Sequence, residues 1–456
     1  MEMDHRMTRF RWLLGVLVLS GIGLLVACAT NFNRSTDGLV VTGSWGSNLL
    51  ESFFFGLNSG SVTAIGNTPI DTASLTCVLN GAPTAIVLDP AGAYAYAIIQ
   101  AYTPCNSGTV TSTTGLMSFK VNSDGTLGTG STQVAFNNEN VTNASTGGVE
   151  AVPVVPSTIM VMDTAGKYLF VADRATTDST GLYVPGAISV FAVSSGTITE
   201  VSGSPFYTTP TPITSAQPTN DFSAVAITPT VFPTQNAVCS EYPLPTVEYL
   251  YAVDARGYQI FEFGVNMSTG ALGNPSGATS VLSFPTDQVP NGVTVDPCNR
   301  FVYVSDSLTN KISAYTMCNG STTQSASCTI PTTLPAGSLI PVSGSPFSLT
   351  AGANGPGPLV VDAFGNYLYV LELLSNQISI LNVSPVTGAL VANKIPTVTT
   401  GSEPKAIGLR SDDSWLFVSN FNSATLSEYA ITPQTGTLSA APTIQTDNYP
   451  WGIAVK

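Results

Sequence analysis

The chain of 456 residues contains a single histidine, His5, and few charged residues. Charged side chains make up 9% of the sequence, and 28 acidic against 14 basic residues give a formal net charge of −14. Phosphate binding needs clustered Lys and Arg, so we expect no nucleic-acid partner. His5 precedes a predicted cleavage site. A mature chain without histidine excludes Ser-His-Asp and Cys-His catalysis and zinc sites of the His-Glu-x-x-His type.

The common nucleophile and nucleotide motifs are absent as well. The sequence contains no Gly-x-Ser-x-Gly elbow, no Walker loop and no dinucleotide-binding Gly-x-Gly-x-x-Gly. No segment shows convincing helical periodicity. Aromatic residues are plentiful, with 16 Tyr and 20 Phe. The chain can therefore build a large core, and the composition excludes disorder.

The first residues predict export. Arg6, Arg9 and Arg11 precede an apolar run over residues 12–27, which has the length of a signal-peptide core. The run ends at Cys28, and this junction resembles the lipobox of bacterial lipoproteins. We expect a signal peptide over 1–27, acylation of Cys28 and a polar tether over 28–37. The alternative is an uncleaved transmembrane helix, although the run is short for a span.

The rest of the chain repeats one short pattern. The clearest copy is Val302-Tyr303-Val304-Ser305-Asp306. The other copies are found at Leu169–Asp173, Leu250–Asp254, Leu368–Glu372, Leu416–Asn420, Ala95–Ile99 and Leu39–Gly43. Seven copies of one unit indicate a repeat architecture.

Each copy has similar neighbours. An apolar strand and a turn containing Asp-Pro or Gly precede it, as at Val293–Pro297. An alternating strand follows, such as Lys311–Tyr315, and then a turn with Thr-Gly or Asp-Gly, such as Thr387-Gly388. Each unit therefore reads as four short strands. Seven such units predict an all-β, seven-bladed β-propeller, whereas a set of β-sandwiches would not explain why the unit recurs so closely.

The two ends of the repeat predict ring closure. The segment Pro450–Lys456 looks like a first strand with nothing after it, and residues 38–70 hold later strands with nothing before them. We expect the C-terminal strand to complete the N-terminal blade within a propeller over 38–456. The expected blades are 38–70 with 450–456, then 83–137, 156–206, 219–284, 290–347, 356–398 and 404–446.

The Tyr-Val-Ser-Asp repeat with its Asp-Pro turn resembles the YVTN type of β-propeller. More specifically, it is similar to the bacterial seven-bladed lactonase family, whose namesake activity is 6-phosphogluconolactonase. The resemblance implies a lactone hydrolase. Enzymes of that family often carry His before the first strand of a blade. Asn291 and Ser157 stand at the matching places here, so a carboxylate or arginine route would have to replace the histidine.

The second strands predict a ring of polar residues. Their ends lie on the face where the first strands begin, and four consecutive blades offer a carboxylate there, with two arginines close by. The candidate ligand-binding residues are Asp173, Arg174, Asp254, Arg256, Asp306, Glu372 and Asn420. Oxygen donors suit calcium, which we expect at Asp254 and Asp306 if any cation binds. Alternatively, each residue ends its strand by bonding its own loop.

Two functions follow from these features. The first is a monomeric binding module, lipid-anchored at the cell envelope, that presents its loops to a protein or a glycan. The second is a lactone hydrolase that uses the carboxylates at the channel mouth. Neither hypothesis requires a firmly bound cofactor.

Six cysteines besides Cys28 predict disulfides in an exported chain. Cys239 and Cys298 fall in equivalent loops of adjacent blades. Cys318 and Cys328 share one loop. Cys77 and Cys105 flank one blade and complete the predicted pairing.

Overall fold

The computed structural model describes residues 38–55, 62–65, 70–71, 81–101, 114–128, 132–136, 139–142, 149–152, 155–177, 183–208, 220–229, 239, 247–275, 278–318 and 335–456. The signal segment, the tether and Cys28 lie outside this part of the chain. In the part that is described, every named element is a β-strand. No helix there is long and apolar enough to cross a membrane.

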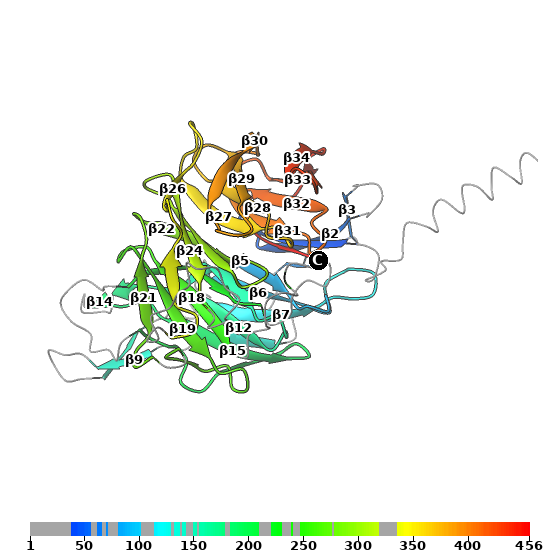
Figure 1. Cartoon of the computed structure of the whole chain (residues 1–456). Helices are drawn as coiled ribbons and strands as arrows, with labels where there is room; N and C mark the ends of the chain where they lie inside the picture. The colour runs from blue at the N-terminus through cyan, green and yellow to red at the C-terminus, as the bar shows by residue number, and fades with distance from the viewer. Residues whose placement is uncertain are drawn as a thin grey trace, which may run out of the picture.

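Most of the described strands form seven antiparallel sheets of four or five strands, which are the seven predicted blades (Figure 1). The innermost strands are β36 (Pro450–Val455), β5 (Gly81–Leu88), β11 (Val155–Met162), β17 (Phe222–Ile227), β22 (Pro290–Val295), β27 (Pro356–Val361) and β31 (Pro404–Leu409). The second strands are β1 (Gly38–Ser44), β6 (Tyr94–Ala101), β12 (Tyr168–Arg174), β18 (Glu248–Asp254), β23 (Phe301–Asp306), β28 (Tyr367–Glu372) and β32 (Trp415–Asn420).

The outer half of each blade holds the third and fourth strands. The third strands are β2 (Leu49–Phe55), β7 (Gly115–Lys120), β15 (Ile188–Ser194), β19 (Gln259–Val265), β24 (Lys311–Met317), β29 (Gln377–Val383) and β33 (Thr425–Thr432). The fourth strands are β3 (Val62–Ala64), β8 (Thr132–Ala135), β16 (Thr197–Glu200), β20 (Leu272–Gly273), β25 (Leu339–Pro341), β30 (Leu390–Thr399) and β34 (Thr437–Ala440). Short pieces at β4 (Ile70–Asp71), β21 (Leu282–Pro285), β26 (Phe347–Ser348) and β35 (Ile444–Gln445) also pair with third strands.

Two short hairpins were not predicted. One pairs β9 (Glu139–Thr142) with β10 (Val149–Val152), between the second and third blades. The other pairs β13 (Thr176–Thr177) with β14 (Tyr183–Val184), inside the third blade. Both are insertions into loops, which the repeat pattern does not encode.

The ring closes as predicted. β36 pairs antiparallel with β1, so the last strand completes the first blade. The innermost strands of neighbouring blades contact one another all the way round, from β36 through β5 to β31 and back to β36. In Figure 1 the C-terminus accordingly lies beside β31 and β2. Each inner strand is the inner edge of its own sheet, and β36 supplies this strand to the first blade, which begins with the second strand β1.

Aromatic residues of the second strands join each blade to the next. The hydroxyl of Tyr303 donates to the carbonyl of Gly388 in the following blade, at 3.2 Å, and Tyr251 does the same to Gly337 at 2.8 Å. The neighbouring ring of Phe301 covers Gly388, where an added Cβ would lie 2.5 Å from the ring. Gly388 also has a positive φ of 73°. The Thr-Gly turns are therefore sites of contact between blades, and only glycine fits there without strain.

We call the side of the ring where the inner strands begin the mouth face, and the opposite side the turn face. On the turn face, Asp163 and Asp362 accept hydrogen bonds from backbone N–H groups of their own turns. These residues are turn residues, and each stabilises the turn between the first and second strands of its blade.

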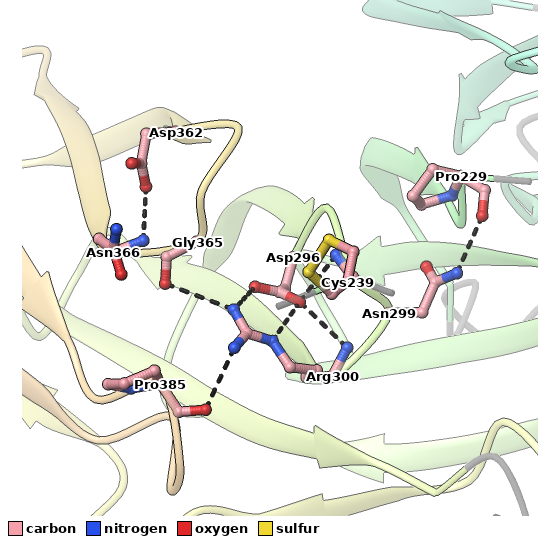
Figure 2. The surroundings of a disulfide bond; sticks show 10 residues. Pro229, Cys239, Asp296, Asn299, Arg300, Asp362, Gly365, Asn366 and Pro385 are labelled. Carbon is pink, nitrogen blue, oxygen red and sulfur yellow. Dashed lines mark hydrogen bonds and ion pairs between the residues drawn. A yellow bond between two sulfur atoms is a disulfide. The ribbon is translucent and has the colours of Figure 1, made fainter. Parts of the chain in front are cut away.

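A disulfide and a buried ion pair reinforce the turn face between the fourth, fifth and sixth blades (Figure 2). Cys239 and Cys298 form the predicted disulfide, and both residues are buried. Arg300 binds Asp296 through two hydrogen bonds of 2.9 and 2.7 Å, and donates to the carbonyl of Pro385 in the next blade at 3.1 Å. These contacts link three neighbouring blades.

The remaining cysteines are described only in part. Cys318 is disulfide-bonded. Its predicted partner, Cys328, lies outside the described residues, as do Cys77 and Cys105.

Candidate functional site

Every inner strand carries a β-bulge near its first residue. In the fifth blade Pro290 pairs with Asp306 and Gly292 with Ser305, so Asn291 is an extra residue in β22. The same irregularity recurs in the other six blades. It involves Thr84, Ser157–Ile159, Ser223, Gly357-Pro358, Lys405 and Trp451-Gly452. A bulge changes the direction in which a side chain points. The residues at these positions therefore determine which chemical groups lie at the channel mouth.

Lys405 is the exceptional residue at these positions. It is the only charged residue in the seven inner strands, all of which the structure describes. Thr84 and Ser223 are buried, and the hydroxyl of Ser223 donates to the carbonyl of Pro290. Asn291, Lys405 and Trp451 are half-buried. One ammonium group thus stands at the mouth of an otherwise uncharged channel wall.

The surroundings of Lys405 hold its ammonium group in place. Its Nζ lies 2.7 Å from Oε1 of Glu403. The same Nζ lies 5.1 Å from the ring centroid of Phe421 and 4.9 Å from that of Trp451. Both distances are typical of cation–π contacts. The side chain of Lys405 is 23% exposed, so it stays accessible to a solute.

Two of these rings contact Lys405, and two further rings pack against them. We call the four the mouth cluster: Trp45, Phe421, Tyr449 and Trp451. The ring centroids of Trp45 and Trp451 are 5.2 Å apart, and those of Phe421 and Tyr449 are 4.8 Å apart. Phe421 and Trp451 meet edge to face at 5.3 Å. The cluster joins the seventh blade to the first, where the ring closes.

Backbone geometry brings these side chains to the mouth face. Glu403 and Tyr449 each precede the proline that opens an inner strand, and both have positive φ values, of 55° and 60°. The amide of Phe421 donates to the carbonyl of Glu403, and the amide of Trp45 donates to that of Tyr449, both at 2.9 Å. In these two blades the loop before the inner strand is thereby tied to the loop after the second strand.

The predicted polar ring lies on the mouth face, as expected. Four of the five residues pair with the first residue of an inner strand: Asp254, Asp306, Glu372 and Asn420. Asp173 pairs with Pro156, the second residue of β11. In the first blade the equivalent residue is Ser44, one position beyond the expected Gly43, because Ser44 pairs with Pro450. All five residues of the ring are buried.

Hydrogen bonds within single blades engage most of these residues. Asp254 Oδ1 accepts from the amides of Asp221, Arg256 and Gly257. Asp306 accepts from the hydroxyl of Ser313 at 2.7 Å. Asp173 likewise accepts from the hydroxyl of Ser189 at 2.7 Å. Asn420 accepts from the amide of Gly401 and donates to Ser427. These contacts are those of residues that fasten their own loops.

Burial makes two members of the ring, Asp306 and Glu372, harder to ionise. It raises the pKa of Asp306 to about 7, against a smaller opposing effect of the Ser313 hydrogen bond. It raises the pKa of Glu372 to about 7 as well. Both side chains are thus poorly suited to carry a full negative charge at neutral pH.

The two predicted arginines are exposed on the same face. Arg174 binds Asp221 through two hydrogen bonds of 2.7 and 2.9 Å, and its side chain is 43% exposed. Burial alone would raise the pKa of Asp221, but the pair with Arg174 and the charge of Arg256 lower it below its ordinary value. The arginines therefore act on Asp221 rather than on the carboxylates of the ring.

The described residues contain no group of three or more His, Cys, Asp or Glu arranged to hold a metal ion. Calcium binding at Asp254 and Asp306 stays a prediction. Calorimetry of the wild type and of Asp254→Asn with Asp306→Asn, with and without calcium, would test it.

The sequence reasoning missed Lys405 and the mouth cluster. A comparison of the inner strands would have found them, since Pro404-Lys405-Ala406-Ile407 aligns with Pro290-Asn291-Gly292-Val293. Lys405 thus occupies the bulge position equivalent to Asn291.

Comparison with known proteins agrees with the fold. Residues 240–451 match a family model described as a lactonase, 7-bladed β-propeller. This part of the chain is therefore similar to the lactonase family. The matched part of this lactonase-type propeller contains Lys405, Glu403, Phe421, Tyr449 and Trp451. A search of curated proteins finds no match for the chain.

Solved structures extend the likeness over the whole ring. A protein of Bacteroides uniformis, provisionally assigned as a 6-phosphogluconolactonase, has a TM-score of 0.62 at 16% identity, covering 92% of this chain and 100% of that one. The periplasmic gluconolactonase of Pseudomonas aeruginosa has a TM-score of 0.61 at 18% identity, covering 92% of this chain and 99% of that one. At these identities the likeness shows that the fold is shared.

Proposed function

We propose that this lactonase-family propeller is an exported lactone hydrolase whose reaction takes place beside Lys405. The observation that carries the proposal is the placement of Lys405, the only charged side chain of the seven inner strands, 2.7 Å from the carboxylate of Glu403. A cation and a carboxylate at a channel mouth supply the two groups that ester hydrolysis needs. The family match and the gluconolactonase neighbour support the choice of lactones.

The pair can act without histidine. Water adds to the lactone carbonyl carbon while Glu403 accepts one of its protons as a general base. The carbonyl oxygen becomes an oxyanion, which the ammonium group of Lys405 stabilises. The ring C–O bond then breaks, and Glu403 passes the proton to the departing ring oxygen. The product is a hydroxy acid.

Hydrolysis of glucono-1,5-lactone and 6-phosphogluconolactone, corrected for the spontaneous rate, tests the proposal. Lys405→Met should lower kcat/KM by about a hundredfold or more, as the removal of an oxyanion donor does. Lys311→Met is the matched control, because Lys311 also pairs with a carboxylate on this face, Asp287, at 2.8 Å, but lies on a third strand. Turnover that survives Lys405→Met, or no turnover by the wild type, would contradict the proposal.

The proposed location is the cell envelope, with a lipid on Cys28 as the only contact with the membrane. The disulfide between Cys239 and Cys298 supports export, since such bonds persist in oxidising compartments. Mass spectrometry of the mature N-terminus tests the anchor. An unmodified Cys28, or cleavage elsewhere, would refute it.

A binding module for a protein or a glycan is the second candidate. The half-exposed mouth cluster favours it, because accessible aromatic rings can bind a ligand without catalysing any reaction. Saturable ligand binding with no lactone turnover would support this alternative over the hydrolase.

A further inference from the structure

We propose that the mouth cluster is a stacking subsite for a neutral sugar ring, which lies against Tyr449 and Trp451 with its hydroxyl groups toward Glu403 and Lys405. The inference rests on the proposed function only for the identity of the reacting group, since sugar binding does not require turnover. It assigns a substrate class, an uncharged carbohydrate, to this face of the ring.

The fold itself does not require aromatic residues at these places. Trp45 and Phe421 begin the loops after the second strands of the first and seventh blades, and the same loop position holds Ala255, Ser307 and Leu373 in the fourth, fifth and sixth blades. Each of these amides pairs with the carbonyl of a residue before an inner strand. The loops thus close in the same way with small or aliphatic residues.

The other two cluster positions show the same contrast. Tyr449 precedes the inner-strand proline, where the fifth and sixth blades have Val289 and Gly355. Trp451 occupies the bulge where they have Asn291 and Gly357. Tyr449 is also 44% exposed, which is unusual for an aromatic side chain that serves only the core. The four aromatic residues at this blade junction are therefore not needed to build the propeller. Their presence indicates that they bind a ligand.

The cluster suits a sugar because it combines rings with polar groups. The C–H face of a pyranose packs on aromatic rings, while its hydroxyl groups need donors and acceptors at the edge. Lys405 Nζ lies within about 5 Å of the Phe421 and Trp451 centroids (5.1 and 4.9 Å), and it contacts Glu403 Oε1. Apolar faces and hydrogen-bonding groups thus stand side by side.

The local charge favours a neutral ligand over a phosphorylated one. Glu403 already pairs with Lys405. Two further carboxylates lie at the same blade junction, because Glu51 accepts from the backbone amide of Asp447 at 3.0 Å. Burial raises the pKa of Glu51, and the charge of Asp447 adds to the shift. A raised pKa favours the neutral form of Glu51, so the excess negative charge comes from Glu403 and Asp447. These two carboxylates against one ammonium group would repel a phosphate dianion.

Tryptophan fluorescence gives a direct test. The chain has four tryptophans, of which Trp45 and Trp451 belong to the cluster, Trp415 lies elsewhere and Trp12 is in the predicted signal peptide. Titration with cellobiose and with glucose should change the emission saturably. Glucose 6-phosphate, compared with glucose, should bind about tenfold more weakly, because it adds only the phosphate.

Variants locate the binding. Tyr449→Asn should raise the Kd for cellobiose about tenfold through the lost ring. Asparagine tolerates the positive φ at this position, as Asn310 and Asn376 show. Phe421→Leu should also weaken binding. Trp415→Phe is the control and should leave the Kd and the signal change intact, because Trp415 packs on Phe55 instead.

The outcomes separate this inference from the proposed hydrolase. Sugar binding without lactone turnover would sustain the subsite and remove the hydrolase. An absence of saturable binding by the neutral sugars would overturn the subsite, whatever the turnover. An unchanged Kd in Tyr449→Asn and Phe421→Leu, or tighter binding of glucose 6-phosphate than of glucose, would also overturn it.

Discussion

The two faces of the ring hold the same kind of ion pair in different surroundings. On the mouth face, Lys405 lies 2.7 Å from Glu403, and on the turn face Arg300 lies 2.7 Å from Asp296. The side chains of Arg300 and Asp296 are 3% and 0% exposed, whereas those of Lys405 and Glu403 are 23% and 39% exposed. Distance alone therefore does not reveal the role of a pair. The pair of Arg300 and Asp296 is buried and has further partners, so it stabilises the contact between blades. The pair of Lys405 and Glu403 is partly exposed and stays available for a ligand.

The largest effect is expected from breaking the buried pair. Arg300→Met should lower the free energy of unfolding by about 4 kcal/mol, because it leaves the charge of Asp296 buried without its partner. The hydrogen bond to Pro385 is lost as well. Denaturant unfolding measures the change. Asp296→Asn combined with Arg300→Met should be less destabilising than the single change, and an additive loss would contradict this explanation.

The disulfide should contribute somewhat less. Cys239→Ser with Cys298→Ser opens a link between residues 59 apart in sequence, and we expect a loss of about 3 kcal/mol from the freed unfolded chain. Thermal unfolding of this double variant is preferable to reduction, because Cys318 is also disulfide-bonded. An unchanged melting temperature would show that the disulfide contributes nothing to the stability of the folded protein.

The repeat made much of this fold predictable, because its information is local. The pattern around Tyr303 fixed the strand count, and the loop positions of Cys239 and Cys298 gave their pairing. The bulges were not predictable, since an extra residue such as Lys405 becomes visible only once β31 is paired with β32. The ring of acids was placed correctly along the chain. Its partners, such as Ser313, lie on another strand, and no local pattern reveals that contact.

Between the two faces, buried acids should make stability depend on pH. Glu262 in β19 is buried, and burial raises its pKa to about 9. The folded state keeps the proton that the unfolded state releases, so stability should fall as pH rises. Between about pH 7 and pH 9 this amounts to about 2 kcal/mol, from a limiting slope of about 1.4 kcal/mol per pH unit.

Glu262→Gln should flatten the dependence in that range. Glu428 occupies the equivalent position in β33, and burial raises its pKa to about 7. Glu428→Gln should therefore flatten the curve below pH 7 and leave the higher range unchanged. Identical pH profiles for the wild type and Glu262→Gln would contradict the assignment.

The smallest effect is expected for an exposed pair on the mouth face. Arg174→Met should lower stability by less than about 1 kcal/mol, because the side chain is 43% exposed and water screens its pair with Asp221. Added salt should reduce even this difference. A loss as large as that in Arg300→Met would remove the contrast between the faces.

The central claim is that the ion pair on the mouth face serves the reaction and the pair on the turn face serves stability. The most direct test measures both lactone turnover and the free energy of unfolding for Lys405→Met and for Arg300→Met. We predict that Lys405→Met loses turnover and keeps its stability, whereas Arg300→Met loses stability and, below its melting temperature, keeps its turnover. If Lys405→Met hydrolyses lactones as fast as the wild type, or if Arg300→Met alone abolishes turnover while folded, the reaction does not take place at Lys405 on the mouth face.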